Sequence, residues 1–277
     1  MLLGGSKMRV ILLTHGGAEL VIENIIGLEN IELVGVFIET ATTPTRGLRE
    51  KLKRSVKYDG YFETLKKIVS IVSKSKSSSE NTENLLADSR QLTISTAEKD
   101  SIPVFYVENY HTQSSIDLMQ KCNADLGVIF GTNIVKEIVF SIPKLGSINL
   151  HQGLAPYYRG GPPVFWELFN DENEVGITVH FVASKVDTGD IILQETVPLR
   201  YDFSYDTNFE LFLEEFRSNL KSTCAVLVSK AVNMIANGNF PRIKQDISLG
   251  KRYRLPVKTE KNELKRRLKV RKLNNFE

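Results

Sequence analysis

The stretch MRVILLTHGGAELVIENIIGLENIELVGVFIET, residues 8–40, holds the pattern that decides the fold. Arg9–Thr14 is a short apolar run that two glycines interrupt, Ala18–Leu28 has apolar residues at helical spacing, and Ile31–Ile38 is a second apolar run. Strand, glycine turn, helix and strand in this order are typical of a βαβ unit in a parallel sheet. We therefore expect an α/β fold.

The same alternation continues along the chain. Helical spacing recurs over Ser114–Lys121, and further strands are expected at Val104–Val107, Leu126–Phe130, Ile148–Leu150, Gly176–Val182 and Ile191–Val197. Short and nearly all-apolar strands are typical of a sheet that is covered on both faces. We predict a Rossmann-like, mostly parallel sheet.

Three segments differ from this alternation. Arg46–Ile71 mixes charges with apolar residues at helical spacing, which predicts a helical excursion. Residues 73–101 begin with SKSKSSSENTE, which has almost nothing to bury, so we expect a polar loop or insertion. Asp206–Asn237 has apolar residues three and four apart and predicts a long helix that ends at Gly238. We expect a main domain over residues 1–200, followed by a helix and a basic tail over 201–277.

Composition places the chain among ordinary soluble globular proteins. Hydrophobic residues make up 42% of the 277 residues and charged residues 25%. No apolar run reaches the ~20 residues of a membrane span, and the first residues lack the apolar core of a secretory signal. Cys122 and Cys224 stand alone, so we expect no metal site and no disulfide framework. A reducing cytoplasm is the expected location.

Charge is unevenly distributed along the chain. Arg242–Glu277 contains thirteen Lys and Arg against four Asp and Glu, a local charge of +9 within a net charge of +3, so the rest carries −6. Clustered basic residues often contact phosphates. Glu260–Leu273 is equally typical of a solvated amphipathic helix, which we favour, so we do not expect a nucleic-acid partner.

Polar residues gather at the ends of the later strands, in SINLHQGLAPYYRGGPP and in VDTGD. Asn149 and His151 lie two residues apart and share one face of a strand end, where open parallel sheets bind ligands. If the turn at Asp187 folds back, its carboxylate reaches His151 and favours the charged imidazole. Imidazolium and amide then stabilise an oxyanion, and the carboxylate takes a proton. Singly, each residue is also compatible with a cap, a structural histidine or a turn.

The loop Pro156–Pro163 is rich in proline and glycine and carries two tyrosines and Arg159. It is either a surface loop that leads into a helix over Val164–Phe169 or one wall of a substrate cleft. In the second case Arg159 is available to an anionic substrate.

These motifs resemble the formyltetrahydrofolate-dependent formyltransferase family. Its pattern N-x-H-P-S-L-L-P, followed by Y-R-G and a later D-x-G turn, matches Asn149–Pro156, Tyr158–Gly160 and Asp187–Gly189 in order and spacing. The match extends over roughly residues 125–198. Two departures stand inside the motif, because Gln152 and Gly153 replace Pro-Ser and Ala155 replaces Leu.

The resemblance implies a Rossmann-like formyltransferase domain whose co-substrate is N10-formyltetrahydrofolate, with no metal. It implies Asn149, His151 and Asp187 as the catalytic set and His180 and Gly189 as supporting residues. The folate would lie against residues from the 129–134 strand end and the 183–187 turn: Ile129, Phe130, Gly131, Thr132, Ile134 and Val186. The acceptor would meet Tyr158, Arg159, Gly160 and the first turn, His15, Gly16 and Gly17.

The acceptor is reached by elimination. Seventy-nine residues follow Pro198, too few for the β-barrel domain of methionyl-tRNA formyltransferases. The first turn lacks the Gly-Ser-Asn that binds phosphate in glycinamide ribonucleotide formyltransferases, although two glycines before a helix still allow anion binding. An amino group of a nucleotide-linked sugar is the preferred acceptor, and a homodimer is left open. Formyltetrahydrofolate hydrolysis and a non-catalytic folate- or nucleotide-binding module are the competing functions.

Overall fold

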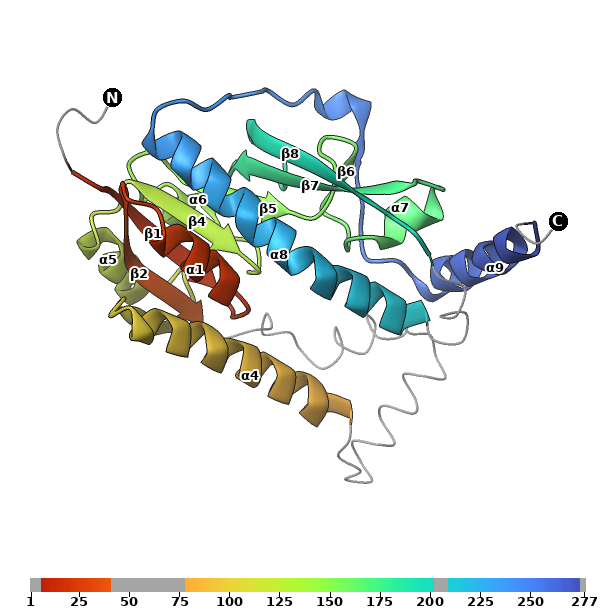
Figure 1. The fold of residues 1–277 in the computed structure, drawn as a ribbon, viewed down its shortest axis with the longest axis horizontal. Coiled ribbons are helices and arrows are strands. Elements are labelled where there is room, and N and C mark those ends of the chain that lie inside the picture. Colours follow the sequence, from red (N-terminus) through yellow and green to blue (C-terminus); the bar gives the residue numbers. More distant parts are fainter. Residues whose placement is uncertain (1–5, 41–77, 202–208, 275–277) are drawn as a thin grey trace.

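The computed structural model describes residues 6–40, 78–201 and 209–274, and its centre is one twisted sheet (Figure 1). The strand order is β3-β2-β1-β4-β5-β7-β8. The bounds are β1 Met8–Thr14, β2 Ile31–Glu39, β3 Val104–Val107, β4 Leu126–Phe130, β5 Ser147–His151, β7 Glu174–Phe181 and β8 Ile191–Pro198. The first five strands pair in parallel, whereas β7 and β8 are antiparallel. The predicted α/β, mostly parallel sheet is confirmed.

Helices cover both faces of the sheet, which explains the all-apolar strands. In β1, Val10 and Leu12 belong to one buried cluster and Ile11 and Leu13 to the other. Buried side chains of α1 (Glu19–Ile26), α4 (Ser78–Lys99) and α8 (Phe209–Ala236) join the first cluster, and those of α5 (Gln113–Lys121) and α6 (Glu137–Phe140) join the second. The long α8 lies along α1 in Figure 1.

The polar segment before β3 is helical, which corrects the predicted loop over residues 73–101. Helix α4 covers Ser78–Lys99. Three small or medium side chains on one face, Thr93, Ile94 and Ala97, are buried, and the Thr93 hydroxyl accepts the N–H of Ala18 at 3.1 Å. This narrow face packs on α1, so few apolar residues suffice. The helix predicted over Arg46–Ile71 lies outside the described residues.

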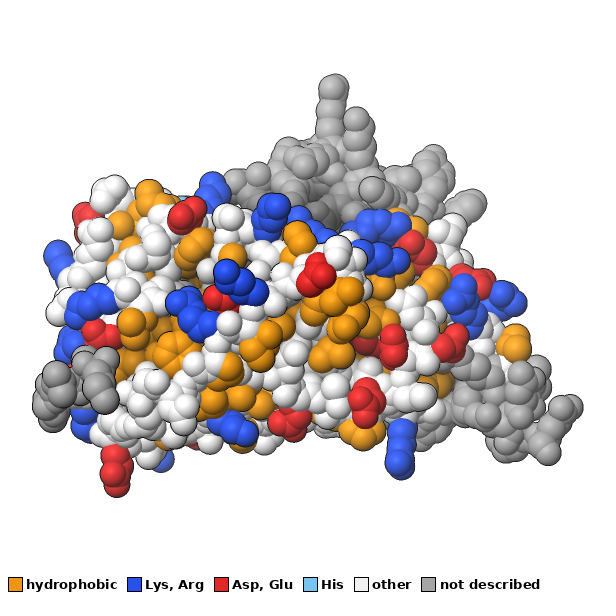
Figure 2. Space-filling view, turned by 90° about the horizontal axis from the view of Figure 1, so that it is seen from above, with side chains coloured by type: hydrophobic (Ala, Val, Ile, Leu, Met, Phe, Trp, Pro, Cys, Tyr) orange, Lys and Arg blue, Asp and Glu red, His pale blue; other side chains and the backbone are white. Residues whose placement is uncertain are grey.

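The C-terminal part packs on the same core. Helix α9 (Lys258–Asn274) confirms the predicted amphipathic helix, and its Leu264 and Leu268 are buried in the cluster that contains β1. Before it come a 3₁₀ turn, Ile247–Leu249, and β9 (Lys251–Arg252), which pairs in parallel with β6 (Tyr158–Arg159). On the face in Figure 2, Lys and Arg are interspersed with Asp and Glu. That face is therefore not uniformly basic. The boundary predicted near residue 200 stays a prediction.

Carboxyl ends of β1, β4 and β5 meet at one edge of the sheet. The chain crosses from one side of β1 to the other between β3 and β4, and ligands of open α/β sheets bind at such a switch point. The turns after β1 and β4 are neighbours there, since a Cβ on Gly131 would lie 3.9 Å from the carbonyl oxygen of Gly16.

Candidate active site

Strand pairing brings Asn149 and His180 together. Asn149 on β5 is directly opposite His180 on β7, and opposed residues of antiparallel strands project on the same face. The Asn149 amide nitrogen lies 3.4 Å from Nε2 of His180. His151, two residues further along β5, projects on this face as well.

Asp187 lies between the two histidines. Its Oδ2 is 3.4 Å from Nδ1 of His151, and its Oδ1 is 3.5 Å from Nε2 of His180. The backbone N–H of Gly160 donates to Oδ2 at 2.8 Å. Asp187 has φ of +53°, a backbone conformation that is uncommon for residues other than glycine. The predicted catalytic set and the supporting His180 are thus assembled in one place.

The hydrogen bonds of His180 define its tautomer. Its Nδ1 lies 2.7 Å from the carbonyl oxygen of Phe181, so Nδ1 carries a proton and donates. In the neutral ring, Nε2 accepts from the Asn149 amide, and in the protonated ring it donates to Asp187. His180 therefore links the amide to the carboxylate.

Burial controls the charges of His151 and Asp187. Burial raises the pKa of Asp187, but the hydrogen bond from His180 and the charge of His151 outweigh it and lower the pKa to about 2. Burial lowers the pKa of His151 below its ordinary value despite the nearby Asp187. Burial therefore favours the neutral imidazole of His151, whereas Asp187 favours the charged one as expected.

Both nitrogens of His151 face oxygen atoms. Nε2 donates to the carbonyl oxygen of Tyr158 at 2.7 Å, while Nδ1 faces Asp187 at the longer 3.4 Å. Only an imidazolium donates through both nitrogens. A proton that arrives on His151 is therefore stabilised by Asp187, and a substrate oxygen must displace the Tyr158 carbonyl to reach the Nε2 proton.

A cavity of about 250 Å³ opens beside these side chains. Asn149, His151, His180 and Asp187 line it, together with Ile129, Thr132, Asn133, Ile134, Val135, Gly160, Gly161, Val182, Ala183, Ser184 and Val186. Of the predicted folate-binding residues, Phe130 and Gly131 are not part of this lining. Gly189 supports the turn from outside the cavity, since a Cβ there would overlap the Phe181 carbonyl.

Backbone donors of the first turn are already used, which corrects the anion site expected there. The N–H of Gly16 donates to the Thr14 hydroxyl at 3.0 Å. The N–H of Gly17 donates to Ser89 at 3.3 Å, and that of Ala18 to Thr93 at 3.1 Å. A phosphate would have to displace these acceptors.

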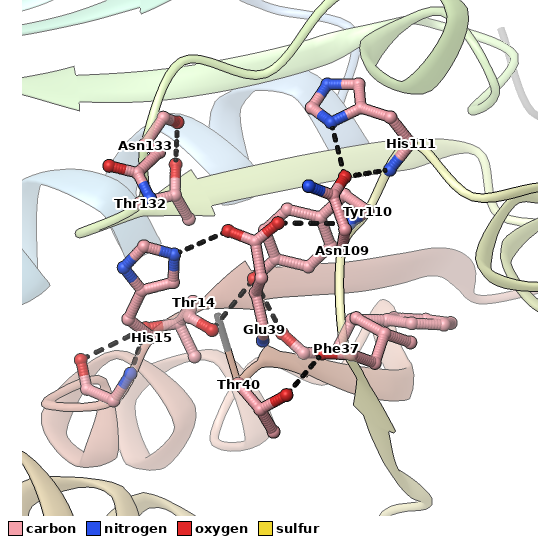
Figure 3. Close-up of polar contacts among 12 residues, drawn as sticks. Thr14, His15, Phe37, Glu39, Thr40, Asn109, Tyr110, His111, Thr132 and Asn133 are labelled. Atoms are coloured by element: carbon pink, nitrogen blue, oxygen red, sulfur yellow. Dashed lines mark hydrogen bonds and ion pairs between the residues drawn. The ribbon is translucent and has the colours of Figure 1, made fainter. Parts of the chain in front are cut away.

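His15 is held in a buried polar network (Figure 3). Its Nε2 is 2.7 Å from Oε2 of Glu39, a side chain that is only 4% exposed. The other oxygen of Glu39 accepts the backbone N–H of Tyr110 at 3.1 Å, and the Tyr110 hydroxyl donates to Thr14 at 2.8 Å. Sequence reasoning missed Glu39, because a carboxylate at the end of an apolar strand had no visible partner.

Arg159 does not face the cavity, which corrects the expectation of a free cation. It is buried, and its guanidinium donates to the carbonyls of Pro156 at 3.1 Å, Ile247 at 3.3 Å and Gly250 at 3.4 Å. The Tyr158 hydroxyl donates to Glu172 at 2.7 Å. From this loop, the Tyr158 carbonyl contacts His151 and the Gly160 N–H contacts Asp187.

Comparison with known proteins decides the family. A family model described as formyl transferase matches residues 52–214, more than half of the chain. The chain belongs to the formyl transferase family. It is 33% identical over 151 residues to a methionyl-tRNA formyltransferase of Azobacteroides pseudotrichonymphae, a match that covers 54% of this chain and 44% of that relative. The chain therefore spans less than half the length of this relative.

Solved formyltransferases share the fold. A sugar N-formyltransferase of a Shewanella species matches with a TM-score of 0.54 at 14% identity, over 89% of this chain and 76% of that one. A glycinamide ribonucleotide transformylase of Symbiobacterium toebii matches with a TM-score of 0.55 at 16% identity, over 88% of this chain and 98% of that one. At these identities the likeness shows the fold alone.

Residues 6–40, 78–201 and 209–274 contain neither a metal-ligand cluster nor a membrane-spanning helix. Within them, no group of three or more His, Cys, Asp and Glu side chains is arranged to hold a metal ion. None of the helices described combines the length and apolar character needed to cross a membrane.

Proposed function

We propose that this protein transfers a formyl group from N10-formyltetrahydrofolate to an amine. One observation carries the proposal: an amide, two imidazoles and a carboxylate meet at the carboxyl edge of the sheet. They form a chain of contacts from Asn149 to His180, to Asp187 and to His151, in which each contact is 3.5 Å or shorter. Membership in the formyl transferase family supports the same reaction.

The residues have distinct roles in this reaction. As the amine attacks the formyl carbonyl, negative charge develops on the carbonyl oxygen, and N–H donors aimed at it lower the barrier. Asn149 and His151 supply those donors, the latter after exchange of its bond to the Tyr158 carbonyl. The attacking amine must also lose a proton, and Asp187, ionised at neutral pH and flanked by two imidazoles, is the acceptor group.

The cavity offers an apolar surface for the pterin ring of the formyl donor. The lining of this cavity includes an apolar wall of Ile129, Ile134, Val135, Val182 and Val186 and a glycine wall of Gly160–Gly161, together with the candidate catalytic side chains. A flat pterin against the apolar wall presents its formyl group to Asn149 and His151. The amine then approaches along the glycine wall.

For the acceptor we propose an amino group on a phosphate-bearing small molecule, with a nucleotide-linked amino sugar preferred. The fold likeness to a sugar N-formyltransferase is compatible with this choice. Methionyl-tRNA is the second candidate, because the relatives found by sequence carry that name. Both acceptors present an amine near phosphate.

Release of tetrahydrofolate tests the function directly. We would follow it spectrophotometrically with nucleotide-linked amino sugars, glycinamide ribonucleotide and methionyl-tRNA, and without an acceptor. Release that depends on one amine supports the proposal and identifies the substrate. Release at the same rate without an amine would establish the hydrolase instead, and folate binding without any release would establish a binding module.

A further inference from the structure

An anionic acceptor needs a positive group near the catalytic side chains, and the first turn does not offer one. The N–H groups of Gly16, Gly17 and Ala18 already donate to protein oxygens, and Arg159 is occupied by three carbonyls. The two features that the sequence offered for anion binding are therefore engaged within the protein.

The C-terminal segment 247–254 packs on the loop whose backbone contacts His151 and Asp187. β9 pairs with β6, and the N–H of Tyr253 donates to the Arg159 carbonyl at 2.7 Å. The Tyr253 ring stacks on Tyr158, with centroids 5.2 Å apart and planes 7° apart, and Trp166 donates to the Arg254 carbonyl at 2.8 Å. This segment is outside the residues that the family model matches, 52–214.

Successive residues of β9 project to opposite sides. Lys251 lies with its Nζ 4.7 Å from the centre of the Tyr253 ring, and it lines a separate cavity that does not include the catalytic side chains. Arg252 lies instead against Gly160. A Cβ on Gly160 would be 3.1 Å from its Cγ and 3.3 Å from its Nε.

Arg252 contacts Gly160, which lines the candidate catalytic cavity, although Arg252 itself is not part of the lining. Gly160 lines that cavity and donates its N–H to Asp187 at 2.8 Å. Arg252 is exposed, and among the described residues its guanidinium has neither a hydrogen bond nor an ion pair. The neighbouring Arg254, by contrast, is paired with Glu260 at 2.8 Å. A planar guanidinium with free N–H groups is suited to bidentate binding of phosphate.

We propose that Arg252 binds the phosphate of the acceptor and thereby holds its amine at the glycine wall. This inference rests on the proposed formyl transfer and deepens it by naming a phosphate-bearing acceptor and the residue that recognises it. In this proposal the C-terminal segment 247–254 supplies the positive charge for anion binding, and the turn after β1 does not.

Steady-state kinetics of Arg252→Ala, Arg252→Lys and the control Lys251→Ala test the proposal. The control removes the same charge one residue away, on the opposite side of β9. For Arg252→Ala we expect the acceptor KM to rise roughly 10-fold or more, the scale for one hydrogen bond to a charged group, with kcat and the donor KM nearly unchanged. Arg252→Lys recovers part of the loss, and Lys251→Ala changes the acceptor KM less than about 3-fold.

A second readout does not depend on turnover. Calorimetric titration with inorganic pyrophosphate should show binding to the wild-type chain and to Lys251→Ala that Arg252→Ala weakens roughly 10-fold. If the wild type transfers no formyl group, this titration still shows whether Arg252 binds an anion. The proposals of formyl transfer and of phosphate binding by Arg252 can therefore fail independently. Equal losses in Arg252→Ala and Lys251→Ala, or a rise in the donor KM instead of the acceptor KM, would overturn the role of Arg252.

Discussion

Two histidine–carboxylate pairs stand at the same edge of the sheet, and they differ in how completely they are satisfied. His15 and Glu39 are 2.7 Å apart, and the second oxygen of Glu39 is taken by a backbone N–H. His151 and Asp187 are 3.4 Å apart, and Asp187 is shared with His180 at 3.5 Å. The first pair is closed, whereas in the second the short contact of Asp187 is to the Gly160 N–H, at 2.8 Å, and both histidine contacts are longer.

The different hydrogen bonding of the two pairs indicates two different roles, one in stability and one in function. A short and fully hydrogen-bonded pair fixes a side chain and stabilises the arrangement around it, since breaking it leaves an uncompensated charge. A carboxylate with long contacts to its histidines and an uncommon backbone conformation, φ +53° at Asp187, is typical of functional sites. We therefore expect variants of the second pair to change turnover and variants of the first to change stability.

The largest expected effect is that of His151→Ala. Loss of one oxyanion donor lowers kcat by about 10²-fold or more, while the melting temperature stays near that of the wild type because the side chain borders a cavity. Single-turnover rates and thermal melts measure both quantities. Turnover near the wild-type value would remove His151 from the mechanism and with it the distinction between the two pairs.

Asp187→Asn should lower kcat by a similar order, because the proton acceptor is lost. Its pH profile carries further information. Burial lowers the pKa of His151 and Asp187 raises it, so Asp187→Asn should lower the pKa of His151 further and move a profile limb that reports His151 to lower pH. A limb that moves upward would show that another group titrates.

Sequence patterns predicted the parallel strands well because each strand signals itself locally. β3 and β4 were placed at their exact residues, and Asn149, His151 and Asp187 were found by their spacing. What escaped prediction depends on contacts distant in the chain. Glu39 contacts His15 and Tyr110, and Arg159 donates to the carbonyls of Ile247 and Gly250. Helix α4 buries a narrow face against α1. No local pattern records such pairings.

Glu167 extends the comparison of the two histidine–carboxylate pairs, because it is a buried carboxylate without a histidine partner. Burial raises its pKa to about 7 from 4.5. The folded chain therefore binds this proton between pH 4.5 and 7 when the unfolded chain does not, so the free energy of unfolding falls as pH rises through that range. Glu167→Gln should flatten this fall and gain up to about 3 kcal/mol at pH 8. Denaturant unfolding at pH 5 and pH 8 measures both, and an unchanged slope would contradict the assignment.

The smallest effect, and the sharpest test of the closed pair, comes from Glu39→Gln. The variant keeps the shape but loses the charge beside His15, so we expect a loss of about 1–3 kcal/mol in the free energy of unfolding, as for a buried hydrogen bond to a charged group. Glu32→Gln is the matched control, because Glu32 is half exposed in its ion pair with Arg9 at 3.0 Å and such pairs contribute less than about 1 kcal/mol. We expect kcat of Glu39→Gln to stay within about 3-fold of the wild type, since neither Glu39 nor His15 lines the catalytic cavity. A fall in kcat on the scale of His151→Ala, with stability intact, would place the closed pair in the chemistry and erase the distinction drawn between them.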